Sequence, residues 1–241
     1  MRFFLLAFSS LLFIFACGKD EVEQIKVKIP EGVIIPEGMA YIPEGDFIMG
    51  HPGDPETKKG KLVNQEAFFI DRFEVTREQF GAFNSDYSFH SQKARYPVSM
   101  VTFETAERYC KSKGRRLPTE AEWEKAARGP DGRKWPWKIY HEHPNNGFSG
   151  FIPEEVDQRD EWISPYGVYG MGHNVWEWIS DWYLSDNVLE IDRKRYKVIR
   201  GGLTQTHTVI KFTPTYFRNK MDPTAYFNFI GFRCACSINC G

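Results

Sequence analysis

The clearest folding signal in this chain is the stretch 116–124, which reads Arg116-Leu117-Pro118-Thr119-Glu120-Ala121-Glu122-Trp123-Glu124. Thr119 followed three residues later by Glu122 is a capping-box pattern, in which each side chain accepts a hydrogen bond from the other residue's backbone. The pair Gly129-Pro130 cannot continue a helix. The sequence therefore predicts a short helix that starts after Thr119 and ends at Gly129.

Two more helices are expected upstream of this stretch. Thr76-Arg77-Glu78-Gln79 repeats the capping-box pattern and places Phe80 and Phe83 on one face of the helix that follows. A third helix is expected over Thr102–Lys113, ending at Gly114. Its apolar residues at helical spacing are Phe103, Ala106, Tyr109 and Cys110. Between these helices the chain predicts short strands, turns and long loops.

Further landmarks stand in a fixed order on both sides of residues 116–124. They are Met39-Ala-Tyr-Ile-Pro-Glu-Gly-Asp-Phe-Ile-Met-Gly50, Phe69-Ile-Asp-Arg-Phe-Glu-Val-Thr76, Asn174-Val-Trp-Glu-Trp178 with Asp181-Trp182, Arg200-Gly-Gly202, and Gly231-Phe-Arg-Cys-Ala235. This succession resembles the formylglycine-generating enzyme (sulfatase-modifying factor) family over roughly residues 38–236. The resemblance implies an α+β, C-type-lectin-like fold, rich in loops, with a small twisted antiparallel sheet and two main helices.

Composition limits the classes of partner. The chain has 31 Lys and Arg against 32 Asp and Glu, 41% apolar residues and 16% aromatic residues. Such a chain is neither disordered nor collagen-like. The basic residues are dispersed and the net charge is -1, so we expect no nucleic-acid partner. About 200 residues beyond the N-terminal leader suit one domain.

The N-terminus has the pattern of an export signal. Arg2 precedes an apolar run, Phe3–Ala16, that is too short to span a bilayer comfortably. Ile14-Phe-Ala-Cys-Gly18 resembles the lipobox of bacterial lipoproteins, although a plain secreted protein or an uncleaved anchor stays an alternative. We expect a signal peptide at 1–16, lipid attached at Cys17, a tether at 17–37 and a domain at 38–241. The expected location is the cell envelope, lipid-anchored and facing the periplasm or the surface.

A short repeat begins in the tether and continues into the start of the expected domain. Ile-Pro-Glu-Gly occurs at residues 29–32, 35–38 and 42–45. Proline fixes φ and glycine permits positive φ, so each copy predicts a tight turn between short extended pieces. The copies are only six and seven residues apart and the repeat stops after three of them, so it does not indicate a solenoid.

Four cysteines remain beyond Cys17, and export makes disulfides their expected state. A metal site built from Cys234, Cys236 and Cys240 is the less favoured alternative, because it lacks a second spaced pair. The family resemblance implies a bridge between Cys110 and Cys234, which leaves Cys236 to pair with Cys240.

The resemblance also implies where an oxidase would hold copper. In the oxidases two cysteines five positions apart bind Cu(I), the second lying nineteen residues before the cysteine that matches Cys234. Those places hold Ile210 and Thr215 here, and neither side chain is a soft ligand for Cu(I). We therefore expect no copper chemistry and assign no catalytic residue.

Histidine and iron give a weaker signal. His141-Glu142-His143 could present two imidazoles, but the stretch is rich in Pro and Asn and is better interpreted as a solvated loop. His173 stands alone, and a packed histidine is the more frequent state.

Calcium is the metal that the resemblance favours. Asn174, Glu177 and Asp181, with the carbonyl of Ile179, would supply the oxygen ligands that Ca²⁺ prefers. The alternative is that Asn174 and Asp181 only bind backbone groups. A second site would begin at Asn146-Gly147, in a loop that lacks an obvious completing carboxylate.

Two sets of large side chains could bind a partner. Trp176, Trp178, Trp182 and Tyr183 could line a groove, although such a cluster is more often core. Arg200, Arg218 and Arg233 are interpreted as scaffold residues that tie carbonyl groups together. Arg218 and Trp176 are the candidates for binding.

These observations favour a noncatalytic binding or structural lipoprotein of a cell-envelope assembly. Its partners would be membrane lipid, through acylated Cys17, and an envelope protein. One alternative is an oxidoreductase of the formylglycine-generating or nonheme-iron type with a changed site. Another is a receptor diversified by a retroelement, because such receptors share the lectin-like fold.

Overall fold

The computed structural model describes residues 25–52, 60–137, 153–184, 194–205 and 210–240. Its helices are those that the caps predict: α1 (Arg77–Phe83), α2 (Phe103–Ser112) and α3 (Glu120–Arg128), with two short 3-10 turns at Ser91–Lys93 and Asp160–Trp162. Thr76 and Thr119 form complete capping boxes, and α3 ends at Gly129.

The strands form several small sheets instead of the single sheet that the resemblance implied. One has the order β1-β4-β11 and another β10-β5-β6-β9, while β2 pairs with β3 and β7 with β8. All pairs are antiparallel except β10 with β5. The strands are β1 Met39–Ile42, β2 Gly45–Met49, β3 Lys61–Gln65, β4 Phe68–Asp71, β5 Trp176–Trp182, β6 Lys197–Gly201, β7 Leu203–Gln205, β8 Ile210–Phe212, β9 Arg218–Met221, β10 Ile230–Gly231 and β11 Ala235–Ser237.

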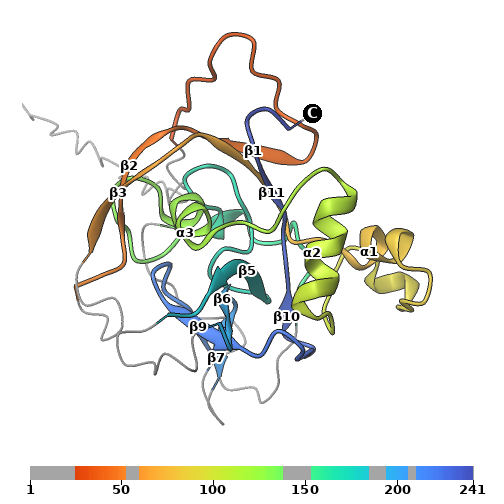
Figure 1. Ribbon diagram of the computed structural model, residues 1–241. Helices are drawn as coiled ribbons and strands as arrows, with labels where there is room; N and C mark the ends of the chain where they lie inside the picture. Colours follow the sequence, from red (N-terminus) through yellow and green to blue (C-terminus); the bar gives the residue numbers. More distant parts are fainter. Residues whose placement is uncertain (1–24, 53–59, 138–152, 185–193, 206–209, 241) are drawn as a thin grey trace, which may run out of the picture.

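Helix α3 lies at the centre of the molecule, between the N-terminal strands and the β5–β6 sheet (Figure 1). It packs against β2 and β3 on one side and β5 and β6 on the other. Trp123 is fully buried in an apolar cluster to which β1, β4, β5 and β6 contribute. Helices α1 and α2 lie to one side and cover a second core, which contains Phe80, Tyr109 and Trp178.

Both expected disulfides are present. Cys110 of α2 is joined to Cys234 with 5.6 Å between their Cα atoms, and Cys236 is joined to Cys240. The long bridge ties α2 to the segment that leads into β11, so it links elements 124 residues apart.

Residues 25–37, part of the segment expected as a tether, lie against the domain, and we call them the strap. The backbone N–H of Ile25 donates to the carbonyl of Pro165 at 2.9 Å. Val27, Val33 and Ile35 pack on a small core beside β1 and β4. The strap is thus held against the domain by apolar contacts and a backbone hydrogen bond, in addition to its covalent connection to β1.

In the described ranges, no helix has the length and apolar character needed to cross a membrane. The leader and Cys17 fall outside those ranges.

Candidate functional site

A buried ion pair joins the C-terminal landmark to β5. Arg233 and Glu177 are both fully buried. The Arg233 guanidinium donates to both Glu177 carboxylate oxygens at 2.7 Å and also to the carbonyls of Asp71 and Tyr169. The indole N–H of Trp123 donates to Glu177 at 2.9 Å. Arg233 is therefore the scaffold residue that the sequence predicted, and Glu177 is its counter-ion.

Glu74 is the residue at this centre that sequence reasoning missed. Its carboxylate is buried, and neither oxygen accepts a hydrogen bond from any group in the described structure. The nearest Arg233 nitrogen is 3.9 Å away. Burial raises the pKa of Glu74 to about 8, against the opposing charge of Arg233 and with the help of Glu177. No spacing in the sequence links Glu74 to Glu177, because only the fold brings them together.

Gly170 closes one side of this carboxylate. It has φ +77°, and a Cβ at that position would collide with the Glu74 carboxylate. Only glycine combines that backbone conformation with so close an approach.

The predicted calcium ligands lie on β5 and, for Asn174, two residues before it. The Asn174 amide oxygen accepts from the backbone N–H of Glu154 at 3.0 Å, and the Asp181 carboxylate accepts from the N–H of Glu120 at the start of α3 at 2.8 Å. Glu177 and Asp181 are four residues apart in a strand, roughly 10 to 13 Å, so the two carboxylates do not meet. Ile179 is buried between them. The structure therefore groups Glu177 with Glu74 and places Asp181 elsewhere.

The described residues contain no group of three or more His, Cys, Asp or Glu side chains that could hold a metal. Asn146, Gly147, His141 and His143 lie outside those residues. His173 is buried and packs edge-on against Trp162, with the ring centroids 4.9 Å apart.

The place where the resemblance puts the oxidase cysteines is occupied by structural contacts. Thr215 is fully buried, and its hydroxyl donates to the carbonyls of Arg133 and Lys134 at 2.9 and 3.2 Å. Its own carbonyl accepts from Arg200 at 2.8 Å. Ile210 belongs to β8, and its side chain is outside the described part. All cysteines of the described residues are in disulfides.

Arg200 and Arg218 extend this network. Arg200 pairs with Glu120 and Glu124 of α3, and Arg218 lies 3.0 Å from Glu120. Burial raises the pKa of Glu120, while the two arginines lower it. Arg218 also donates to the carbonyl of Leu184 and stacks over Tyr183. Its charge is therefore tied to the scaffold.

Trp176 likewise has a structural role. It is 5% exposed, and its indole N–H donates to the carbonyl of Leu203 at 3.2 Å. Trp178 is completely buried and donates to Val101. Trp176 and Trp178, two of the four residues considered for an aromatic groove, therefore belong to the core.

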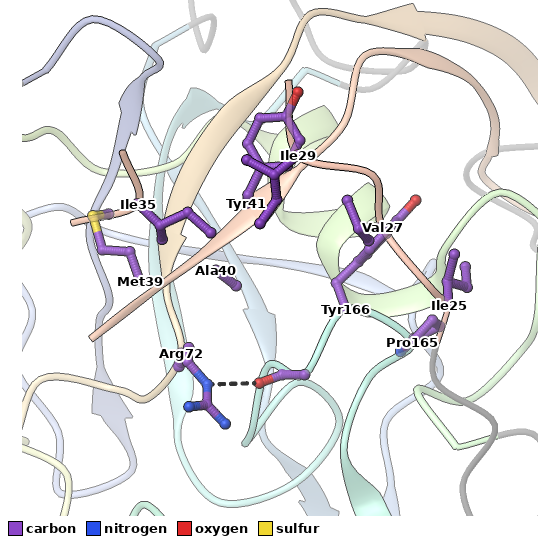
Figure 2. A pocket seen from close by; sticks show the side chains of 11 residues that line it. Ile25, Val27, Ile29, Ile35, Met39, Ala40, Tyr41, Arg72, Pro165 and Tyr166 are labelled. Carbon is purple, nitrogen blue, oxygen red and sulfur yellow. Dashed lines mark hydrogen bonds between the residues drawn. The ribbon is translucent and has the colours of Figure 1, made fainter. Parts of the chain in front are cut away.

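A pocket of about 280 Å³ lies elsewhere, between the strap and β1 (Figure 2). Strap side chains, among them Val27 and Ile29, line it together with Tyr41 and Tyr166. Arg72 lies at its edge and donates to the carbonyl of Gly167 at 3.2 Å. The pocket shares no residue with the Glu74 centre.

Comparison with known proteins agrees with the landmarks. A model of the sulfatase-modifying factor enzyme 1-like domain matches residues 28–238. The chain belongs to this family. The match starts within the strap, which agrees with the contacts that the strap makes.

Curated relatives of this domain have different names. Protein YfmG of Bacillus subtilis is 27% identical over 88% of this chain, which spans 58% of that protein's length. The formylglycine-generating enzyme of Thermomonospora curvata is 28% identical over 63% of this chain and 74% of its own. The inactive C-alpha-formylglycine-generating enzyme 2 of Bos taurus is 31% identical over 60% of this chain and 51% of its own.

Solved structures share the fold at low identity. The Treponema denticola variable protein 1 has a TM-score of 0.64 and 21% identity, covering 83% of this chain and 94% of that one. CarF has a TM-score of 0.61 and 20% identity, covering 86% and 100%. These likenesses establish the α+β, lectin-like fold of the family.

Proposed function

We propose that this protein is an exported lipoprotein, anchored through acylated Cys17, whose sulfatase-modifying-factor domain has a noncatalytic binding or structural role in a cell-envelope assembly. The observation that carries the noncatalytic part is Thr215. At the place of a copper thiolate stands a buried hydroxyl with two carbonyl partners. A hydroxyl is a hard, weak ligand for Cu(I).

The remaining cysteines support the same conclusion. Four are consumed by disulfides, and the fifth is Cys17, the proposed lipid site. Loss of the oxidase activity also has a counterpart among relatives, since one of them is named an inactive formylglycine-generating enzyme.

The decisive experiment supplies the purified protein with Cu(I), oxygen and a peptide that contains Cys-x-Pro-x-Arg. We expect no formylglycine by mass spectrometry, while the Thermomonospora curvata relative run in parallel should convert the peptide. Copper-dependent conversion that Cys234→Ser or Cys236→Ser abolishes would contradict the proposal, because the C-terminal cysteines would then have replaced the missing pair.

The anchor is tested separately. Expressed in a bacterium that processes lipoproteins, the wild-type protein should fractionate with membranes, and Cys17→Ala should be released or stay unprocessed. Several acyl chains are needed for stable anchoring, because one binds reversibly. A fully processed Cys17→Ala protein that stays on the membrane would contradict the anchor.

We further propose that the buried acidic centre binds calcium. Three carboxylates, those of Asp71, Glu74 and Glu177, face the guanidinium groups of Arg115 and Arg233. With all three carboxylates ionised, one negative charge is in excess, and an uncompensated buried charge is very costly. The Glu74 carboxylate supplies two hard oxygen atoms without a hydrogen-bond partner, which suit Ca²⁺, whereas the Glu177 oxygens and the Asn174 amide oxygen already accept hydrogen bonds from Arg233, Trp123 and Glu154.

Thermal unfolding tests this site. Chelation should lower the wild-type midpoint, since a ligand at a hundred times its dissociation constant stabilises by about 2.7 kcal/mol. Glu74→Gln should remove the response while keeping the side-chain shape, and Asp181→Asn should retain it. If the chelator leaves the wild-type midpoint unchanged, the calcium proposal is wrong, and a proton on Glu74 is what neutralises the buried charge.

A further inference from the structure

Three of the four exposed isoleucines of the described residues belong to the strap or to the C-terminal loop beside it, and the fourth is Ile48 of β2. Ile34 is 86% exposed, Ile29 is 45% exposed, and Ile238, in the loop closed by the Cys236–Cys240 bridge, is 43% exposed. The strap forms the outermost loop at the top of Figure 1, beside the C-terminus. Single exposed apolar residues are common, but a group at one end indicates a contact surface.

Two turns give the strap a defined backbone path on either side of Ile34. The N–H of Val33 donates to Pro30 and that of Met39 donates to Pro36, with Gly32 and Gly38 at φ +83° and +75°. These two turns follow the Ile-Pro-Glu-Gly repeat. Ile29 still lines the pocket of Figure 2 with part of its side chain, whereas Ile34 takes no part in the pocket. Little ordering entropy is therefore lost when this surface meets a partner.

The position of Cys17 indicates the partner. Ile25 begins the described chain at this end, and Cys17 precedes it by eight residues. Eight residues span at most about 28 Å when fully extended. A lipid on Cys17 would therefore keep the strap end of the domain close to the bilayer.

The charges of the strap determine the kind of contact. Lys26 and Lys28 are exposed, and so are Glu31 and Glu37, so this surface is neutral overall. Attraction to anionic lipid headgroups is then weak, and apolar insertion is left as the source of affinity. Lysine side chains beside such a surface can reach back to the aqueous phase.

We propose that the strap end lies on the membrane, with Ile34 and Ile238 inserted into the interfacial layer of a phospholipid bilayer. This orientation rests on the proposed lipid anchor. It turns β9, at the other end of the molecule in Figure 1, toward the aqueous side and leaves that side open for envelope partners.

The test uses the full, acylated protein in phosphatidylcholine vesicles that carry a lipid-borne fluorescence quencher. An environment-sensitive fluorophore is attached to Ile34→Cys, which provides the one free thiol beside the bridged and acylated cysteines. The matched control carries the fluorophore on Lys220→Cys, an exposed position of β9. We expect several-fold stronger quenching of the Ile34 label than of the Lys220 label, unchanged by high salt.

Each other outcome contradicts the orientation. Equal quenching of both labels on vesicle-bound protein overturns it and leaves the anchor intact. Protein that stays in the supernatant overturns the anchor and the orientation together. The emission wavelength of the Ile34 label could also shift without vesicles and shift further as the protein concentration rises. That result would assign the surface to a second copy of the chain.

Discussion

At the residue scale, the pKa of Glu74 is set by the buried groups around its carboxylate. An acid whose folded pKa lies above its unfolded value keeps a proton that the unfolded chain has already lost. For Glu74 this window extends from about 4.5 to about 8. Folding stability should therefore fall as pH rises through that window when no cation is present, and level off above it.

The variant Glu74→Gln isolates this effect. In chelator, urea unfolding of the wild type should give a free energy that decreases between pH 5 and pH 8, and Glu74→Gln should show a smaller decrease. Asp71, whose pKa burial raises to about 6, contributes in the same direction and is common to both proteins. Parallel pH profiles for the two proteins would mean that Glu74 is ionised throughout.

At the element scale, α3 is the helix on which the site depends. Its first two turns place Glu120 and Glu124 against Arg200, while Trp123 reaches Glu177 from the same helix. The Thr119 hydroxyl accepts from the N–H of Glu122, and the Glu122 carboxylate accepts from the N–H of Thr119. The cap therefore determines the residue at which α3 begins, and with it the positions of these side chains along the helix.

Thr119→Ala should cost about 1 kcal/mol of folding stability, because one capping partner of α3 is lost. Thr224→Ala is a matched control: Thr224 is exposed, and its hydroxyl binds only the neighbouring Asp222. Chemical denaturation should separate the two variants, and equal effects would show that the capping box adds nothing beyond a surface hydroxyl.

At the scale of the whole molecule, the two disulfides should contribute different amounts to the free energy of unfolding. In the chain-entropy model, the bridge across 124 residues stabilises by about 5 kcal/mol, and the bridge across four residues by about 2 kcal/mol. The double variant Cys110→Ala with Cys234→Ala should therefore lose far more stability than Cys236→Ala with Cys240→Ala. A larger loss from the short bridge would mean that it holds the strap end together through contacts with Met39 and Val33.

The sequence by itself determined the local features of this protein. Thr76, Thr102 and Thr119 start the three helices as expected, because a cap needs only residues within one turn. The order of landmarks predicted the family and the Cys110–Cys234 bridge. Thr215, too, could be identified by counting residues, although its carbonyl partners could not.

Only the tertiary structure decided which distant groups meet. Glu74 joins Glu177 and Arg233 because the chain after β4, strand β5 and the segment after β10 converge, and no periodicity encodes that convergence. Asp181 falls away from the same centre because a strand extends by more than 3 Å per residue. The strap became part of the domain because burial of Val27, Val33 and Ile35 holds it there, and burial is a property of the folded chain as a whole.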